Sequence, residues 1–218
     1  DMNPRPLALL IFGGVLLGLA VKVPMMPFHT WLPATYAEAP TPVTMLLTGV
    51  MSKMGMYGFL RILLPIFPQQ INWVMKPLLA LAVFTIVFSA CAAFAQRDLK
   101  RILAYSSIAH LGYLIVAFLA SGTLGAAAVT FYLVTYFITT IGALGVITVL
   151  SDGGEGDLDR LEDFRGLFAR RPWLAAVMAG MLLSPAGIPL SAGFVGKFYV
   201  TVAAGSAALW ALLVVMMI

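Results

Sequence analysis

Lys53 is the residue of this chain most suited to proton chemistry, because it lies inside an otherwise uncharged apolar run, from Val43 to Leu60. Ten residues of helix place it about 15 Å from Val43, near the middle of a bilayer core. An ammonium at that depth costs at least about 2.5–3.5 kcal/mol on insertion scales. Desolvation favours the neutral amine, so such a lysine can release and regain a proton near neutral pH. The sequence predicts a proton or ion carrier here, and the alternative is a structural lysine that snorkels or pairs.

Lys22 stands beside a proline at the end of another apolar run, residues 7–21. The chain stays apolar and aromatic beyond Pro24, which favours a helix broken at that proline. A broken helix would keep Lys22 at membrane depth, beside a protein-lined or wet cavity. An ordinary anchor at the membrane interface is the alternative.

Lys197 has 25 uncharged residues before it and 21 after it. Two full spans could meet in a turn at this lysine. Pro185 and Pro189, however, remove backbone donors and disrupt helix geometry. The pattern therefore favours one long helix broken at 184–189, with Lys197 inside the membrane on its second half.

His110 lies in a further apolar run, and its predicted helical face carries Ser106, Ser107 and Tyr113 at spacings of three and four. A second polar stripe follows on the next predicted span, at Tyr132, Thr135, Tyr136, Thr139 and Thr140. Such stripes serve helix packing or line a hydrated channel, and a histidine packed for structural reasons is the alternative. The candidate lining of a water path is Ser52, Tyr57, Ser106, Ser107, Tyr113, Tyr136 and Thr139.

The composition indicates a membrane protein, since 61% of the 218 residues are hydrophobic and 10% are charged, against about 25% charged residues in soluble domains. The net charge of +4 comes from short loops rather than from a basic stripe, so no nucleic-acid partner is expected. One cysteine, Cys91, and two histidines argue against an iron–sulfur or structural zinc site. We expect no catalytic cluster, cofactor or metal in this chain.

The apolar runs predict an all-α, polytopic membrane protein with six or seven transmembrane segments. The runs are residues 7–21, 43–60, 77–96, 102–150, 172–196 and 198–218. The run 102–150 is too long for one crossing and is divided at Ser121-Gly122. Because the chain ends inside an apolar run, we expect residues 1–218 to form one transporter domain within a longer protein.

Loops 96–101 and 151–171 carry most of the loop cations. Alternation of the spans puts seven lysines and arginines on the side of these loops and three on the other. This bias predicts that both loops face the cytoplasm or an organelle matrix. An apolar residue recurs every third position in the second loop, at Leu158, Leu161, Phe164 and Leu167. That spacing predicts a short interfacial amphipathic helix.

Several motifs are similar to those of one known family. They are KVPMMPFHTWLP at 22–33, EAPT at 38–41, SKMGMYG at 52–58, QRDLKRILAYSSIAHLGY at 96–113, RGLFARRPW at 165–173, AGIP at 186–189 and GFVGKF at 193–198. Over nearly its whole length the chain resembles the antiporter-like membrane subunits of respiratory complex I. Multisubunit cation/proton antiporters and membrane-bound hydrogenases share this family. The first third resembles chain M of NADH–quinone oxidoreductase, and the last third resembles chain N.

The resemblance implies the second of two inverted five-helix repeats and proton translocation along a hydrated axis through Lys22, Lys53, His110 and Lys197. It implies a non-redox subunit of a translocase, with the redox cofactors in partner membrane subunits. The expected location is a bacterial or organellar inner membrane. Ala34 departs from the family, which usually has Asp there, and the glutamate that pairs with Lys22 would lie upstream.

Three rival functions remain open. A sodium/proton antiporter would depend on sodium, and the sequence shows no dedicated sodium cage. A membrane-bound hydrogenase subunit would share the same motifs. A structural scaffold would tolerate Met or Leu at Lys53.

Overall fold

The computed structural model describes residues 6–120, 122–151 and 158–206 of the chain. Within these ranges the regular secondary structure is helical, apart from a single antiparallel bridge between Asp98 and Arg160. The predicted all-α membrane fold is confirmed.

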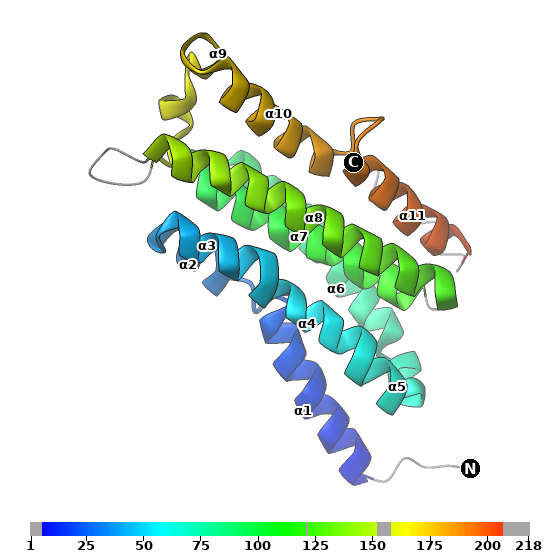
Figure 1. Cartoon of the computed structure of the whole chain (residues 1–218). Coiled ribbons are helices and arrows are strands. Elements are labelled where there is room, and N and C mark those ends of the chain that lie inside the picture. The colour runs from blue at the N-terminus through cyan, green and yellow to red at the C-terminus, as the bar shows by residue number, and fades with distance from the viewer. Residues whose placement is uncertain (1–5, 121, 152–157, 207–218) are drawn as a thin grey trace.

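Four helical stretches in the described ranges are long and apolar enough to cross a membrane. The first is a continuous rod, Thr41–Ile66, made of α3 (Thr41–Leu46), η1 (Leu47–Met51), α4 (Ser52–Gly58), η2 (Phe59–Leu63) and α5 (Leu64–Ile66). The others are α6 (Pro68–Phe94), α7 (Leu99–Leu119) and α8 (Gly122–Ser151), which run side by side with the rod (Figure 1). α6 begins nine residues before the predicted start of its span. The predicted start of this span, at Pro77, was wrong because Pro77 lies inside α6. Membrane helices tolerate internal prolines.

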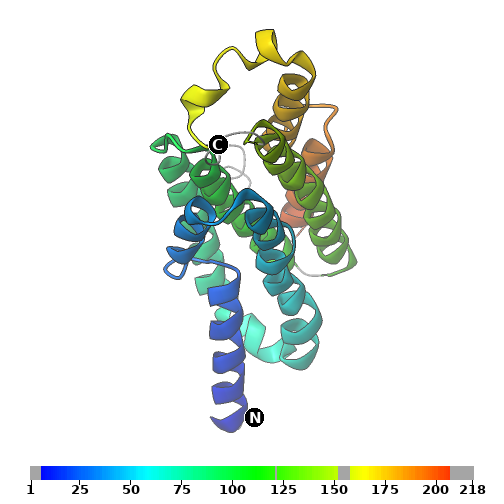
Figure 2. The same ribbon diagram turned by 60° about the vertical axis from the view of Figure 1, so that its left-hand side comes forward.

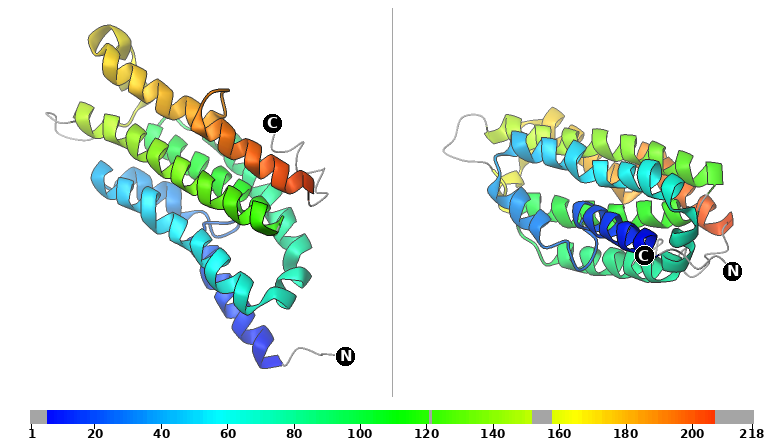
Figure 3. Two further views of the ribbon diagram at one scale, coloured as in Figure 1. Left: turned by 45° about the vertical axis from the view of Figure 1, so that its right-hand side comes forward. Right: turned by 90° about the horizontal axis from the view of Figure 1, so that it is seen from below.

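Two further crossings are each built from two shorter helices. α1 (Pro6–Lys22) and α2 (Trp31–Glu38) are separated by the non-helical residues 23–30, around Pro24. α10 (Pro172–Ala186) and α11 (Ala192–Ser206) lie end to end along α8, with a short loop between them (Figures 1 and 3). The described residues thus hold four continuous helices of membrane-spanning length and two interrupted pairs of shorter helices, with the interruptions near the positions that the sequence predicts.

The second break begins at Gly187, between the two prolines that the sequence singled out. Pro185 lies within the last turn of α10, and Pro189 lies in the loop. Gly187 has φ +88°, and its N–H donates to the Ser184 carbonyl over 3.0 Å. A left-handed glycine of this kind is the common C-terminal stop of a helix, because it has no Cβ to clash.

α7 is the central helix of the bundle. All of its residues from Ser107 to Leu119 are buried, and it contacts α2, α4, α6, α8 and α11. Such a helix, apolar all round, is typical of the middle of a membrane bundle. His110 and Ser107 are therefore held among protein neighbours rather than lipid.

The two arginine-rich loops lie at the same end of the bundle, opposite the start of α1 (Figure 2). They pair directly: the Leu99 N–H donates to the Asp159 carbonyl at 2.6 Å, and the Leu161 N–H donates to the Arg97 carbonyl at 3.1 Å. Asp98 caps α7 by accepting from the N–H of Lys100 at 2.9 Å. The prediction that both loops share one face is thus met in the structure.

Lys100 is not the loop cation that the sequence suggested. It is 2% exposed on the first turn of α7, and its Nζ donates to the Ala39 carbonyl at 3.2 Å. Ala39 is the C-cap of α2, where a cation interacts favourably with the helix end. The number of loop lysines and arginines on this side falls from seven to six. It still exceeds the three on the other side, so the predicted orientation is unchanged.

The predicted amphipathic helix in the second loop is wrong. The segment forms η3 (Leu161–Phe164), a 3₁₀ turn, and α9 (Leu167–Arg170), one turn of α-helix. Gly166 separates them at φ +69°. An apolar residue at every third position matches the three residues per turn of a 3₁₀ helix better than the 3.6 of an α-helix.

The orientation of the bundle can be tested with single cysteines. In a Cys91→Ser background, we expect Glu162→Cys to react with an impermeant maleimide from the cytoplasmic or matrix side only. Gln69→Cys is the matched control, since Gln69 is exposed at the junction of the rod and α6 at the other end. Labelling of Glu162→Cys from the outer side alone would reverse the orientation.

The α10–α11 break can be tested through Gly193, because a Cβ on this residue would overlap the Ser184 carbonyl oxygen. Overpacking against backbone typically costs about 1–3 kcal/mol, so Gly193→Ala should lower the thermal unfolding temperature of the purified assembly. The matched control is Gly180→Ala, where a Cβ meets nothing within 4 Å. That change should be neutral or stabilise α10 by about 0.5–1 kcal/mol. Equal stability of the two variants would mean that the break is looser than described.

Candidate functional site

Lys53 lies on α4 between two π-helical segments, η1 and η2. π-type turns are rare and are found frequently at functional sites. The Lys53 side chain is 6% exposed. Gly55, two residues on, packs against the break after α1, since a Cβ there would lie 2.6 Å from Val23 Cγ2 and 3.2 Å from the Val23 nitrogen. The helix that carries Lys53 therefore packs closely against the break between α1 and α2.

The Lys53 ammonium contacts neutral groups from three helical elements. Its Nζ donates to Ser107 Oγ on α7 at 2.7 Å and to Ser52 Oγ at 3.1 Å, and it lies 4.4 Å from the centre of the Tyr136 ring on α8. Within the described residues it forms no ion pair with a carboxylate. The free-energy cost of burying the ammonium is therefore offset by hydroxyls and an aromatic face rather than by an opposite charge.

His110 lies one turn along α7 from Ser107, among three tyrosines. Its Nδ1 shares a hydrogen bond of 2.5 Å with the Tyr132 hydroxyl, and the proton can sit on either partner according to the tautomer. The ring centres of Tyr113, Tyr132 and Tyr136 lie 5.7, 5.8 and 4.8 Å from that of the imidazole. Tyr136 therefore contacts both Lys53 and His110.

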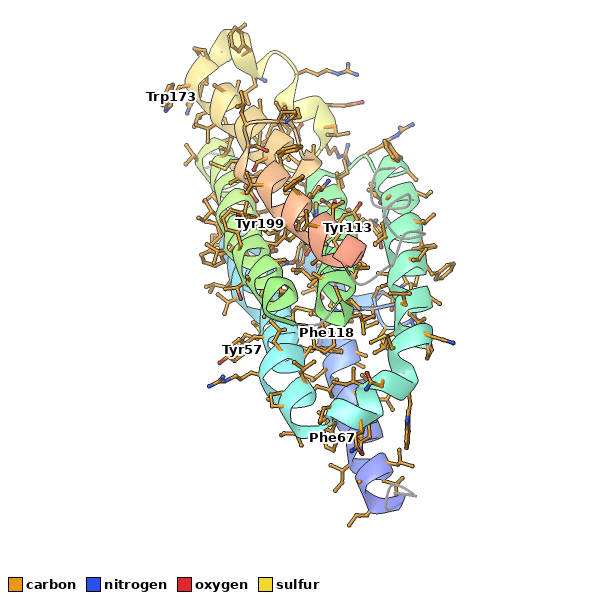
Figure 4. All side chains as sticks on the ribbon, turned by 90° about the vertical axis from the view of Figure 1, so that its right-hand side faces the viewer. Tyr57, Phe67, Tyr113, Phe118, Trp173 and Tyr199 are labelled. Atoms are coloured by element: carbon orange, nitrogen blue, oxygen red, sulfur yellow. The ribbon has the colours of Figure 1, made fainter. Side chains whose placement is uncertain are left out.

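Lys197 lies on α11 and points back toward the break. Its Nζ donates to the Ala186 carbonyl at 3.2 Å, at the C-terminal end of α10, and lies 5.4 Å from the centre of the Tyr113 ring. A cation at a helix C-terminus is favoured by the unpaired carbonyls there. Tyr113 points into the bundle toward this region (Figure 4). The tyrosines thus join Lys53, His110 and Lys197 in one continuous set of contacts.

A cavity of about 450 Å³ adjoins this set of contacts, between α6, α7, α8 and α10. Its polar lining comprises Ser106, His110, Tyr113, Tyr136, Thr139, Thr140 and Lys197. A water molecule occupies about 30 Å³ in the liquid, so the cavity has room for several. The cavity reaches from Lys197 to Ile102 and Leu103, near the loop-bearing end of α7.

Two predicted site residues lie outside the cluster. Tyr57 is 60% exposed and points away from the bundle (Figure 4), so its expected place on a water path is corrected. It follows the fully buried Met56, and one residue is a rotation of about 100° on a helix. Lys22 is exposed at the end of α1, and the residues described here do not bring it to Lys53.

Sequence reasoning missed the buried hydroxyls that approach Lys53 from the loop-bearing end. Tyr36 on α2 and Thr44 on the rod are both 0% exposed. The available signal was the spacing of Thr41, Thr44, Thr48 and Ser52, which repeats every three or four residues. That period marks one face of a helix.

The chain is similar to several known membrane proteins. Residues 2–218 match the family described as NADH:quinone oxidoreductase/Mrp antiporter, TM. NADH-quinone oxidoreductase subunit N of Ectopseudomonas mendocina is 48% identical over 203 residues, which are 92% of this chain and 41% of that protein. Two solved structures share the fold. Respiratory complex I from Thermus thermophilus with bound aureothin has a TM-score of 0.82 and 35% identity, over 100% of this chain and 47% of that one. The Mrp complex from Dietzia sp. has a TM-score of 0.86 and 26% identity, over 94% of this chain and 38% of that one.

The match to the family covers almost every residue, while the chain spans about two fifths of the length of the curated relatives it matches. The family match includes both broken crossings and the three titratable residues of the cluster, Lys53, His110 and Lys197. This chain belongs to the NADH:quinone oxidoreductase/Mrp antiporter transmembrane family.

Proposed function

We propose that the chain translocates protons as part of an antiporter-like subunit of an NADH–quinone oxidoreductase. Protons pass between Lys53 and Lys197 by way of His110 and its tyrosines. The observation that carries the proposal is the unbroken set of contacts from Lys53 to Lys197, made by neutral groups inside a membrane bundle. The electron chemistry belongs to partner subunits.

The neutral partners of Lys53 suit a group that must change its charge. A hydroxyl accepts a hydrogen bond from an ammonium and can donate one to a neutral amine after its proton has rotated. Ser107 and Ser52 can therefore accommodate both protonation states of Lys53. A carboxylate partner would hold the charged form far more strongly.

His110 suits a relay between the two lysines. Its imidazole can bind a proton on one nitrogen and release it from the other. Tyr132 fixes the orientation of the ring through Nδ1, and the adjoining cavity has room for water beside His110 and Lys197. Proton transfer over the remaining gaps would then use water in that cavity.

Lys22 joins the proposed axis only in the full-length protein. It is exposed at the first break in the part of the chain described here, which supports a partner from outside this part. An upstream acidic residue is the expected partner on the family resemblance. Curated relatives named subunit N support the chain N type. On the family resemblance, chain M usually has a glutamate at the position of Lys197, so this lysine supports the same type.

Substitutions of Lys53 distinguish a lysine that carries protons from one with a structural role only. Lys53→Met keeps the length and apolar character of the side chain but binds no proton, and Lys53→Arg keeps a charge that is effectively never lost. We expect both variants to abolish most NADH-driven proton uptake by vesicles that hold the assembled complex. Lys76→Met, a matched change of an exposed lysine on α6, should pump at the wild-type rate.

Native gels should show normal assembly of all three variants. A structural lysine makes the opposite prediction, because removing a buried charge is often neutral or stabilising. Wild-type pumping by an assembled Lys53→Met complex would therefore refute the carrier role.

Sodium dependence separates the proposal from its main rival, an antiporter that exchanges sodium for protons. The described residues hold no group of three or more His, Cys, Asp or Glu side chains, and hard cations favour oxygen-rich sites. We expect equal proton-pumping rates in sodium-free and sodium-containing buffers matched for ionic strength. A rate that saturates with sodium would favour the antiporter.

A further inference from the structure

A stripe of exposed side chains runs along the 41–66 rod on a face turned away from the bundle. Its members are Val43, Leu46, Val50, Met54, Tyr57 and Arg61. They follow one another at steps of three or four residues, which mark one face of a helix. Arg61 is the one charged residue of the rod besides Lys53. An apolar and aromatic stripe thus ends on an exposed cation.

Arg61 lies at membrane depth rather than at the surface. It follows Lys53 by eight residue steps, or about 12 Å of helix rise. With Lys53 near the middle of the core, that distance is less than the half-thickness of about 15 Å. The rod continues beyond Arg61 to Ile66. A guanidinium that faces lipid at this depth is expensive, so Arg61 requires a partner of opposite charge.

The described part of the chain supplies no such partner. Arg61 makes no hydrogen bond and no ion pair there. The acidic residues of the described ranges are Glu38, Asp98, Asp159, Glu162 and Asp163. They lie at the end of α2 or in the two paired loops, at the loop-bearing end. The rod begins at that end with Thr41, twenty residue steps from Arg61, or about 30 Å of helix rise.

The direction of the Arg61 side chain favours a protein carboxylate over a lipid phosphate. In a helix each Cα–Cβ bond tilts toward the N-terminal end, which in the rod is the loop-bearing end. The Arg61 side chain therefore leaves the rod toward the middle of the membrane. The nearer lipid headgroups lie in the opposite direction. A helix packed along the rod, by contrast, can present a carboxylate at this depth.

Tyr57 completes a site for a carboxylate. It precedes Arg61 by four residues, the spacing at which helical side chains are neighbours. Its side chain is 60% exposed and points away from the bundle (Figure 4). A guanidinium can donate two parallel hydrogen bonds to a carboxylate, and a tyrosine hydroxyl can donate a further one. Met, Tyr and Arg are also the residue types enriched in protein interfaces, and the stripe has one of each.

We infer that the stripe from Val43 to Arg61 is a docking face for a membrane helix of a partner subunit, and that Arg61 and Tyr57 bind a carboxylate on that helix. The apolar members of the stripe pack against the same helix. The inference rests on the proposed function for one point, that partner membrane subunits lie beside the chain. It uses neither the cavity nor the contacts of Lys53, so it can fail while the proposed function holds.

Changes of charge at Arg61 test the ion pair in the assembled complex. Arg61→Gln should lower the share of intact complex on native gels several-fold, and Arg61→Glu should lower it further, because two like charges would then meet. Arg61→Lys keeps the charge without the paired donors and should give an intermediate loss. The matched controls are Lys76→Gln and Lys76→Glu on α6, where the lysine is exposed, and both should assemble as the wild type does.

A photo-reactive p-benzoyl-phenylalanine in place of Met54 identifies what covers the stripe, because Met54 is 53% exposed and one turn from Tyr57. We expect a cross-link to another subunit, in a membrane helix that contains Asp or Glu. Replacing that acid by Arg should restore assembly of the Arg61→Glu variant.

Cross-links to phospholipid alone, or within the same subunit alone, would overturn the inference. Wild-type assembly of Arg61→Glu would do the same. Neither result bears on the proton carrier, which the Lys53→Met variant tests separately.

Discussion

The hydrogen bond from Lys53 to Ser107 joins two helices at the depth where a charge is most expensive to bury. Other features of the cluster follow from that cost. α7 must bring a hydroxyl to this level, α8 must present the Tyr136 ring, and the rod must turn Lys53 inward. π-helical segments on both sides of α4 widen the helix locally, which changes the direction in which neighbouring side chains point.

The two broken crossings meet a second requirement, that backbone groups inside a membrane find partners. At the first break, the Met26 N–H donates to Thr85 of α6, and Trp31 Nε1 donates to the Val21 carbonyl. At the second, the Gly193 N–H donates to Ser184 Oγ, and Lys197 donates to the Ala186 carbonyl. Polar side chains from within and across the breaks thus replace helix hydrogen bonds. Lys197 is therefore a structural partner of the break as well as a member of the cluster with Lys53 and His110.

The sequence was informative where a single residue conflicts with its surroundings. A lysine in an apolar run, a histidine with polar neighbours at helical spacing and prolines inside a span each point to a site without any knowledge of packing. Lys53, His110 and Lys197 come together accordingly in the structure. Tyr57 and Lys100 were misjudged because period and loop position do not say which helix covers a residue. Nothing in the sequence marks a π-helical turn, and Tyr36 reads as an ordinary core tyrosine until its neighbours are known.

A chain of hydroxyls, tyrosines and water has no direction of its own, because each member can accept and donate. On the proposed function, direction must come from the charged groups at its ends. Lys53 and Lys197 are each held by neutral atoms in the described residues, so neither lysine has a fixed local counter-charge that would bias the exchange. The first break, by contrast, leaves Lys22 exposed beside the helix of Lys53. A charge that approaches or leaves Lys22 would act on Lys53 through a low-dielectric interior. On the proposed function, the first break is therefore the point at which a charge outside the described residues can act on Lys53.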